Sequence, residues 1–242
     1  MNKLKCVFNW SGGKGSALAL YHCLQDPNLD IRYLVTTIND SVNRISMHGV
    51  SYELLKQQAE EIGIELYEIR LPGMPDMQTY DETMRVHLRK FKFEGIIHSI
   101  FGDILLEDLR KYREDKLAEV GLTALFPLWK RDTRAVVDEF LAFGFKTVIV
   151  CTQEKYGNLL GEEINQELIR TFSEDMDVCG ENGEFHTFAF DGPIFSKPIK
   201  YTLGEKVFKA FKAPKNSTDT CGDIAITQSE NSGFWYVDLL AN

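Results

Sequence analysis

A glycine-rich segment near the start of the chain has the residue types of an anion-binding loop. Residues 11–16 read SGGKGS and follow a short β-rich run at 6–10. Glycines let main-chain N–H groups approach an anion closely, and a helix beginning near the second serine would point its positive end at the same place. The lysine adds a positive charge and the serines add hydroxyl donors. The sequence therefore predicts a phosphate loop formed by Ser11, Gly12, Gly13, Lys14, Gly15 and Ser16.

The phosphate loop matches neither of two common phosphate motifs. The Walker pattern G-x-x-x-x-G-K-S/T is absent, and so is the dinucleotide pattern G-x-G-x-x-G. From these six residues alone, a flexible strand-to-helix turn with an incidental lysine stays open as an alternative.

A second cluster of reactive side chains lies far along the chain. Residues 179–187 read CGENGEFHT and bring Glu181, Glu184 and His186 within six residues. Two carboxylates and an imidazole could bind an amine or ammonia and accept its proton. If the segment is a strand, Glu184 and His186 share one face. The alternative is a polar edge strand with a hydrogen-bonded histidine.

Hydrophobic patterning predicts the elements that position these residues. Apolar runs without in/out alternation are separated by helical stretches, which is typical of a parallel sheet covered on both faces. A stripe at Met77, Tyr80, Met84, Leu88 and Phe91 indicates a helix whose apolar face belongs to the core. The predicted strands are residues 6–10, 31–38, 65–70, 96–101 and 145–151.

These elements predict a doubly wound α/β fold in two parts. Residues 1–150 form the domain with the phosphate loop, and residues 151–242 form a smaller mixed α+β domain with the acidic cluster. Because the two candidate segments lie on opposite sides of this boundary, we expect the active site in a cleft between the two lobes.

Composition narrows the class of protein. The chain has 242 residues, a formal net charge of −9 and five scattered cysteines without a C-x-x-C pair. An acidic chain has no global attraction for nucleic acid or an anionic membrane, so neither is expected as a direct partner. Scattered cysteines and the lack of a signal peptide or a long apolar run favour reduced thiols in a cytoplasmic protein.

The phosphate loop resembles the S-G-G-x-D-S loop of the N-type ATP pyrophosphatases, which belong to the HUP-like adenine nucleotide alpha hydrolase superfamily. It departs at Gly15, where that family has aspartate. The segment CGENGEFHT, continued by FDGPIF at 190–195, is similar to the signature of the diphthine–ammonia ligase family. Shorter matches occur at 47–49 (MHG) and 101–104 (FGDI), and the resemblance runs from about residue 5 to about residue 200.

This resemblance implies an amide-forming ligase that uses ATP. ATP would adenylate an acceptor with release of pyrophosphate, and ammonia would then displace AMP. Magnesium is implied as cofactor, with Asp103 as its candidate ligand. Translation elongation factor 2 is the implied acceptor if the organism makes diphthamide, and the acceptor is unknown otherwise. Further nucleotide-binding candidates are Asp40, His48, Gly102 and Asp103.

Purely structural roles are the alternative for three of these nucleotide-binding candidates. Asp103 would also suit a helix N-cap or a turn, Asp40 a solvated turn, and His48 a solvated loop. Gly15 motivates a second hypothesis, a module that binds ATP or AMP but turns it over poorly, or an enzyme that merely hydrolyses ATP. The sequence leaves open whether the protein acts alone or as a homodimer.

Overall fold

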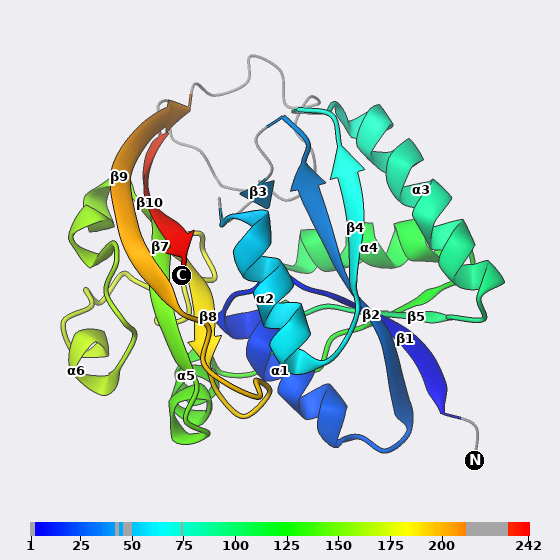
Figure 1. The fold of residues 1–242 in the computed structure, drawn as a ribbon, viewed down its shortest axis with the longest axis horizontal. Helices are drawn as coiled ribbons and strands as arrows, with labels where there is room; N and C mark the ends of the chain where they lie inside the picture. Colours follow the sequence, from blue (N-terminus) through cyan, green and yellow to red (C-terminus); the bar gives the residue numbers. More distant parts are fainter. Residues whose placement is uncertain (1–2, 42–43, 46–49, 74, 212–231) are drawn as a thin grey trace.

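A parallel sheet forms the first layer of the fold (Figure 1). The computed structural model describes residues 3–41, 44–45, 50–73, 75–211 and 232–242. The order of hydrogen-bonded strands is β3-β2-β1-β5-β6, with β4 also paired to β2, and all of these pairs are parallel except β2 with β3. The strands are β1 (Leu4–Asn9), β2 (Leu29–Asn39), β3 (Arg44–Ile45), β4 (Leu66–Leu71), β5 (His98–Ile100) and β6 (Thr123–Leu125).

Helices cover both faces of this sheet, as the sequence predicts. α1 (Lys14–Gln25) and α2 (Tyr52–Ile62) lie on one face, and α3 (Met77–Phe93) and α4 (Glu107–Ala118) on the other (Figure 1). The alternation along β1 explains the two layers. Cys6 and Phe8 join the core cluster that includes α1 and α2, whereas Val7 joins the cluster with α3 residues.

An antiparallel sheet forms the second lobe, with strand order β8-β7-β10-β9. It packs against the α1 and α2 side of the parallel sheet (Figure 1). The elements of the second lobe are α5 (Thr133–Ala142), β7 (Lys146–Gln153), η1 (Glu154–Leu159), α6 (Gln166–Ile169), β8 (Phe185–Asp191), β9 (Tyr201–Phe211) and β10 (Ser232–Ala241).

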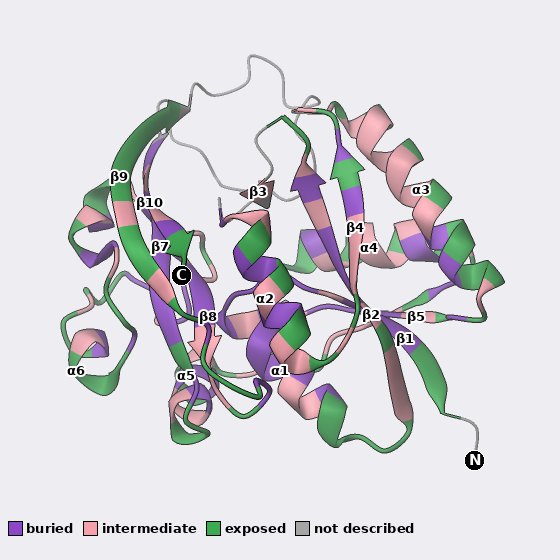
Figure 2. Cartoon of the chain, in the orientation of Figure 1, coloured by how far each residue is buried: buried purple, intermediate pink, exposed green. Residues whose placement is uncertain are grey.

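The prediction that residues 145–151 form the fifth strand of the parallel sheet is wrong. These residues belong to β7, which pairs antiparallel with β8 and β10, and the fifth parallel strand is the short β6. β7 is central in its own sheet and buried on both faces (Figure 2). An unbroken apolar run indicates burial on two sides but does not distinguish the two sheets. The change of sheet therefore falls between β6 and β7, upstream of residue 150.

One hydrophobic core joins the two lobes. The same cluster contains Phe8, Leu18 and Leu54 from the first lobe and Phe145 and Phe188 from the second. α1 and α2 thus bury apolar side chains against both sheets, and the lobes share a core rather than meeting across a polar interface.

The cysteines and the lengths of the helices can be compared with the expectations from composition. Four cysteines, Cys6, Cys23, Cys151 and Cys179, are buried free thiols, while Cys221 lies outside the described residues. Within the described part of the chain, no helix has both the length and the apolar character to cross a membrane.

Candidate functional site

The phosphate loop sits between β1 and the first turn of α1. Gly13 is the N-cap of α1 and gives no side-chain cap hydrogen bond. Ser11 Oγ donates to Ser16 Oγ at 3.0 Å, and Ser16 Oγ donates to the carbonyl of Gly13 at 3.0 Å. The serines therefore brace the loop, and the start of α1 presents main-chain N–H groups and the positive end of the helix dipole. This is the arrangement expected of an anion site.

Main-chain contacts join the phosphate loop to β8 of the second lobe. The N–H of Lys14 donates to Thr187 Oγ1 at 3.0 Å, and the N–H of Ala189 donates to the carbonyl of Gly12 at 2.8 Å. Thr187 is buried, so these bonds are shielded from water. The contacts hold the two predicted functional segments side by side, although 165 residues or more separate them along the chain.

The two glutamates of the acidic cluster have different surroundings. We call residues 177–184 the acid loop. Glu184 is only 4% exposed, and its carboxylate accepts hydrogen bonds from the N–H of Asp177 at 3.0 Å and of Asn182 at 3.0 Å, and from Asn182 Nδ2 at 3.1 Å. Glu181 instead lines the cavity described below. Glu184 therefore braces the acid loop, and Glu181 is the carboxylate that a ligand can reach.

A second carboxylate also braces the acid loop. Asp177 Oδ1 accepts hydrogen bonds from the N–H of Cys179 at 2.8 Å and of Glu181 at 3.2 Å, while its Oδ2 accepts one from Thr133 Oγ1 at 2.6 Å. Thr133 is the first residue of α5. The acid loop is therefore fixed to α5 and held in one shape.

Burial and neighbouring charges tune the titratable groups here. Desolvation raises the pKa of Glu181 to about 7, and the carboxylates of Asp103 and Asp177 add to this, while Lys14 opposes it. Burial alone would lower the pKa of the Lys14 ammonium, but Cys179, Glu181 and Asp177 raise it above its ordinary value. Lys14 is 3% exposed and carries its charge into this cluster.

Histidine 186 is tuned in the opposite direction. Desolvation lowers the pKa of His186 to about 4, so the imidazole is neutral at pH 7. At physiological pH the carboxylate of Glu181, with a pKa of about 7, can take up and release a proton, whereas the neutral His186 imidazole is a weak base suited to hydrogen bonding.

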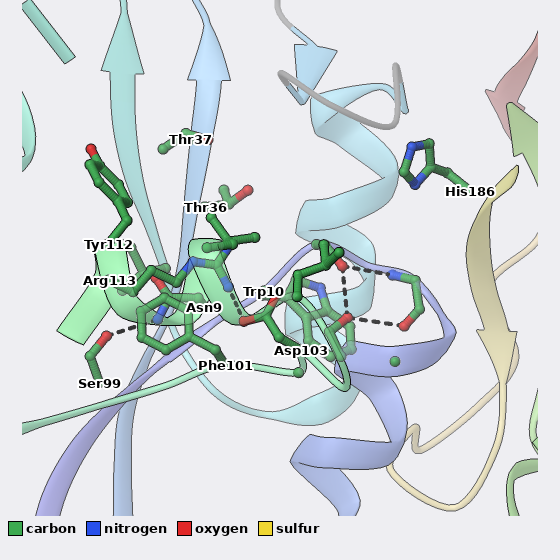
Figure 3. Close-up of a pocket in the computed structure, with 18 of the residues that line it drawn as sticks. Asn9, Trp10, Thr36, Thr37, Ser99, Phe101, Asp103, Tyr112, Arg113 and His186 are labelled. Carbon is green, nitrogen blue, oxygen red and sulfur yellow. Dashed lines mark hydrogen bonds and ion pairs between the residues drawn. The ribbon is translucent and has the colours of Figure 1, made fainter. Parts of the chain in front are cut away.

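A cavity of about 570 Å³ lies where the two lobes meet and contains most of the predicted residues. Figure 3 shows His186 projecting from β8 at one end and Asn9, Ser99 and Tyr112 at the other. A volume of this size suits a nucleotide-sized ligand. Of the predicted site residues, those that line it are Ser11, Gly13, Lys14, Gly15, Ser16, Gly102, Asp103, Glu181 and His186.

The remaining predicted residues lie elsewhere. Gly12 supports the loop from behind through its carbonyl, which accepts from Ala189. Asp40 is exposed at the end of β2 and forms an ion pair with Arg70 at 2.9 Å, and it does not line the cavity. His48 lies outside the described residues.

Asp103 follows β5 at the carboxyl edge of the parallel sheet. Its Oδ2 pairs with Arg113 Nη1, and the Arg113 guanidinium lies 4.5 Å from the centre of the Phe101 ring (Figure 3). Both charged side chains line the cavity. An anionic ligand would therefore meet an arginine here as well as the phosphate loop.

The loop after β5 approaches α1 very closely. A Cβ atom on Gly102 would lie 3.0 Å from the main chain of Gly15 and Ser16, and one on Gly15 would lie 3.3 Å from the carbonyl oxygen of Gly102. Two glycines thus let the segment that carries Asp103 pack directly against the helix N-terminus.

Several cavity residues were missed by the sequence patterns. From α3 and α4 come the charged side chains Asp81, Arg85 and Lys116, and Lys116 pairs with Asp81 at 2.6 Å. Tyr80 and Met84, which the stripe assigns to the core, also line the cavity. Their spacing marks the buried face of α3 correctly, but periodicity does not tell a core from a cavity wall.

The donor set can be compared with the needs of magnesium. Among the described residues, no three His, Cys, Asp or Glu side chains come together as a metal centre. Magnesium, however, is commonly held by one or two carboxylates together with substrate phosphates and water. Asp103, at the cavity wall beside the phosphate loop, fits that arrangement.

The fold and the site define a two-lobed α/β protein with a phosphate loop facing an acid loop. Family models match most of the chain. The diphthamide synthase N-terminal domain covers residues 4–124, and the diphthamide synthase C-terminal domain covers residues 132–215. The chain belongs to the diphthamide synthase family.

Curated relatives agree with this assignment at modest identity. The diphthine–ammonia ligase of Danio rerio is 25% identical over 222 residues, covering 81% of this chain and 86% of its own length. That of Rattus norvegicus is 23% identical, covering 84% and 85%. That of Schizosaccharomyces pombe is 22% identical and covers 81% of this chain, which spans only 36% of the yeast protein.

A solved structure is also similar in part. The U34-tRNA thiolase NcsA from Methanococcus maripaludis matches 59% of this chain and 58% of its own, with a TM-score of 0.37 and 17% identity.

Proposed function

We propose that this protein is an ATP-dependent carbon–nitrogen ligase that forms an amide from an activated carboxylate and ammonia. The observation that carries the proposal is that the phosphate loop and the acid loop face one cavity. The hydrogen bond from the N–H of Lys14 to Thr187 Oγ1 joins the phosphate loop to β8, the strand that directly follows the acid loop. The relatives named diphthine–ammonia ligase support the same reaction class.

ATP would bind with its phosphates at the start of α1. The main-chain N–H groups of the phosphate loop, with Lys14 and Arg113 nearby, would balance the phosphate charge. The base would lie on the apolar part of the cavity formed by Val35, Met84 and neighbouring residues. Pyrophosphate, the leaving group, would remain at the helix dipole, which stabilises its developing charge.

The proposed reaction has two steps, and the second step needs a group that takes up a proton. In the first step, the carboxylate of the substrate attacks the α-phosphorus of ATP, the bond from that phosphorus to the oxygen that bridges to the β-phosphate breaks, and pyrophosphate leaves. Ammonia attacks the acyl carbon of the adenylate, AMP leaves, and the nitrogen loses a proton. Glu181 is the group we assign to take that proton, because it lines the cavity and its pKa of about 7 lets it accept one near neutral pH.

Asp103 would hold a magnesium ion if the reaction uses one. When bound, the ion would supply charge neutralisation to the phosphate oxygens. The ion pair with Arg113 holds the Asp103 side chain at the wall of the cavity.

The names of the relatives suggest the acceptor. We propose diphthine on translation elongation factor 2 if the organism makes diphthamide, and another carboxylate if it does not. An acceptor that takes part in translation would place the reaction in the cytoplasm.

The products of ATP cleavage test the proposed function. The protein is incubated with ATP labelled at the α-phosphate, magnesium, ammonium and a candidate acceptor, and the nucleotides are separated. AMP with pyrophosphate supports the ligase class. ADP would overturn it, because the γ-phosphate would then be the transferred group.

A second candidate function rests on Gly15. An aspartate there would add a carboxylate beside Gly102 and Asp103, and the tight contact with the Gly102 carbonyl shows that the present loop is packed around glycine. If the protein is a nucleotide-binding module with weakened catalysis, Gly15→Asp should raise AMP formation. Unchanged or lower AMP formation in a variant that keeps the wild-type Tm and affinity for ATP would exclude that candidate.

A further inference from the structure

Gln58 is a polar residue on the buried face of α2, where the other buried side chains are Leu54, Leu55 and Ala59. It is 0% exposed. An amide in such a place destabilises the fold unless its polar atoms are hydrogen-bonded.

The Gln58 amide joins three separate segments. Its Oε1 accepts from Trp10 Nε1 at 2.9 Å, and its Nε2 donates to the carbonyls of Gly12 at 3.0 Å and Ala189 at 2.6 Å. One donor partner and two carbonyl partners allow only this orientation of the amide. Gln58 therefore links the end of β1, the phosphate loop and β8.

The shape of the phosphate loop is adapted to this contact. Gly12 has φ of +77°, and a Cβ atom there would lie 2.7 Å from Gln58 Oε1 and 2.8 Å from Leu55 Cδ1. Glycine at position 12 is thus needed twice, for its left-handed conformation and for the approach of α2. The first glycine of the motif faces Gln58 and not the cavity, whose wall it does not form.

The hydrogen bonds of Gln58 lie next to segments that carry proposed functional residues. β8 carries His186, and Ala189 lies three residues further along the same strand. The carbonyl of Gly12 accepts from both Gln58 and Ala189. The amide thereby ties the phosphate loop of one lobe to the strand that leads from the acid loop of the other.

We propose that Gln58 is a positioning residue that sets the distance between the phosphate loop and the reactive groups of the second lobe. The catalytic part of this inference rests on the proposed function, and the structural part does not. Displacing reacting groups by about 1 Å can cost roughly 100-fold in rate. The main-chain N–H groups that would hold the ATP phosphates lie at the start of α1, so a small shift of β8 in a folded variant would affect the rate more than the affinity for ATP.

The test compares Gln58→Met with Leu54→Ala, a buried change on the same helix that leaves the amide in place. In Gln58→Met we expect the N–H groups of Lys14 and Ala189 to exchange with deuterium at least about tenfold faster relative to those of β7. AMP formation should show kcat at least about tenfold lower, with KM for ATP changed less than about threefold. Leu54→Ala should lower Tm without either effect.

Gln58→Glu gives a second measurement if the methionine variant does not fold. It keeps the acceptor for Trp10 and turns the donor into an oxygen facing two carbonyls. Equal relative exchange in the Gln58 and Leu54 variants would overturn the proposal. Wild-type protein that forms no AMP would refute the proposed function, and the exchange result would still decide the role of Gln58.

Discussion

Glu181 and Glu184 stand three residues apart in the sequence and have different tasks in the structure. The Glu184 carboxylate accepts three hydrogen bonds inside the acid loop, whereas Glu181 lines the cavity beside Lys14 and has a raised pKa. At this scale, burial and partners decide which carboxylate can serve the reaction, and sequence spacing alone treats the two as equals.

Glu181→Gln should lower AMP formation by about 10²–10⁴-fold, the range for loss of a general base. In the wild type the rate should also rise as pH passes through about 7, because ionised Glu181 is the form that accepts a proton. The concentration of free ammonia rises with pH in the assays of both proteins, so the pH profile of the variant serves as the control for this effect. Identical pH profiles of the two proteins would contradict the assignment of Glu181.

Glu184→Ala should act on stability first. It removes the buried carboxylate that accepts hydrogen bonds from the N–H groups of Asp177 and Asn182, and the loss of hydrogen bonds to a charged group costs roughly 1–3 kcal/mol. We expect denaturant unfolding to show this loss, and Glu181→Gln to show little or none. A fully stable Glu184→Ala protein would mean that the acid loop does not depend on this brace.

Elements bring these residues together, and here the sequence was informative in part. Alternating strands and helices predict the parallel sheet, and the glycine-rich loop is where α1 begins. The sequence pattern places residues 145–151, the core of β7, in the wrong sheet, because a strand that is buried on both faces has the same unbroken apolar run in a parallel and in an antiparallel sheet. Gln58 and Arg113 were missed, since one buried amide and one helix arginine have no distinctive local pattern.

The contact between the loop after β5 and the start of α1 gives a prediction for these elements. Gly102→Ala would place a methyl group 3.0 Å from the main chain of α1, so that the Asp103 segment must shift. We expect a loss of about 1–3 kcal/mol in stability and roughly tenfold weaker ATP binding by calorimetry.

Gly144→Ala is the matched control for this substitution. Gly144 has φ of +80° and open space around it, so its cost of about 1–2 kcal/mol comes from backbone strain alone. ATP affinity should stay unchanged. If both variants weakened ATP binding equally, the close approach at Gly102 would have no specific role.

The whole molecule is built around helices that serve two sheets. α1 and α2 bury Leu18 and Leu54 in a cluster that includes Phe145 and Phe188 of the second lobe. At the place where we propose that the ATP phosphates bind, Lys14 and the start of α1 supply the positive charge that would offset the net charge of −9. The fold therefore supplies both stability and the site from the junction of the lobes.

A fragment of residues 1–131 tests this dependence. It contains the whole phosphate loop but leaves the second-lobe side of α1 and α2 exposed. We expect it to lack a cooperative thermal transition and to bind no ATP. A fragment that unfolds cooperatively near the Tm of the full chain and binds ATP would show that the lobes are independent.

The most direct test of the account is the fate of ATP labelled at the α-phosphate, with magnesium, ammonium and an acceptor carboxylate present. The two-loop cavity predicts labelled AMP, with an equal amount of pyrophosphate and a strong reduction in Glu181→Gln. Labelled ADP, or AMP formed at the same rate in that variant, would contradict it.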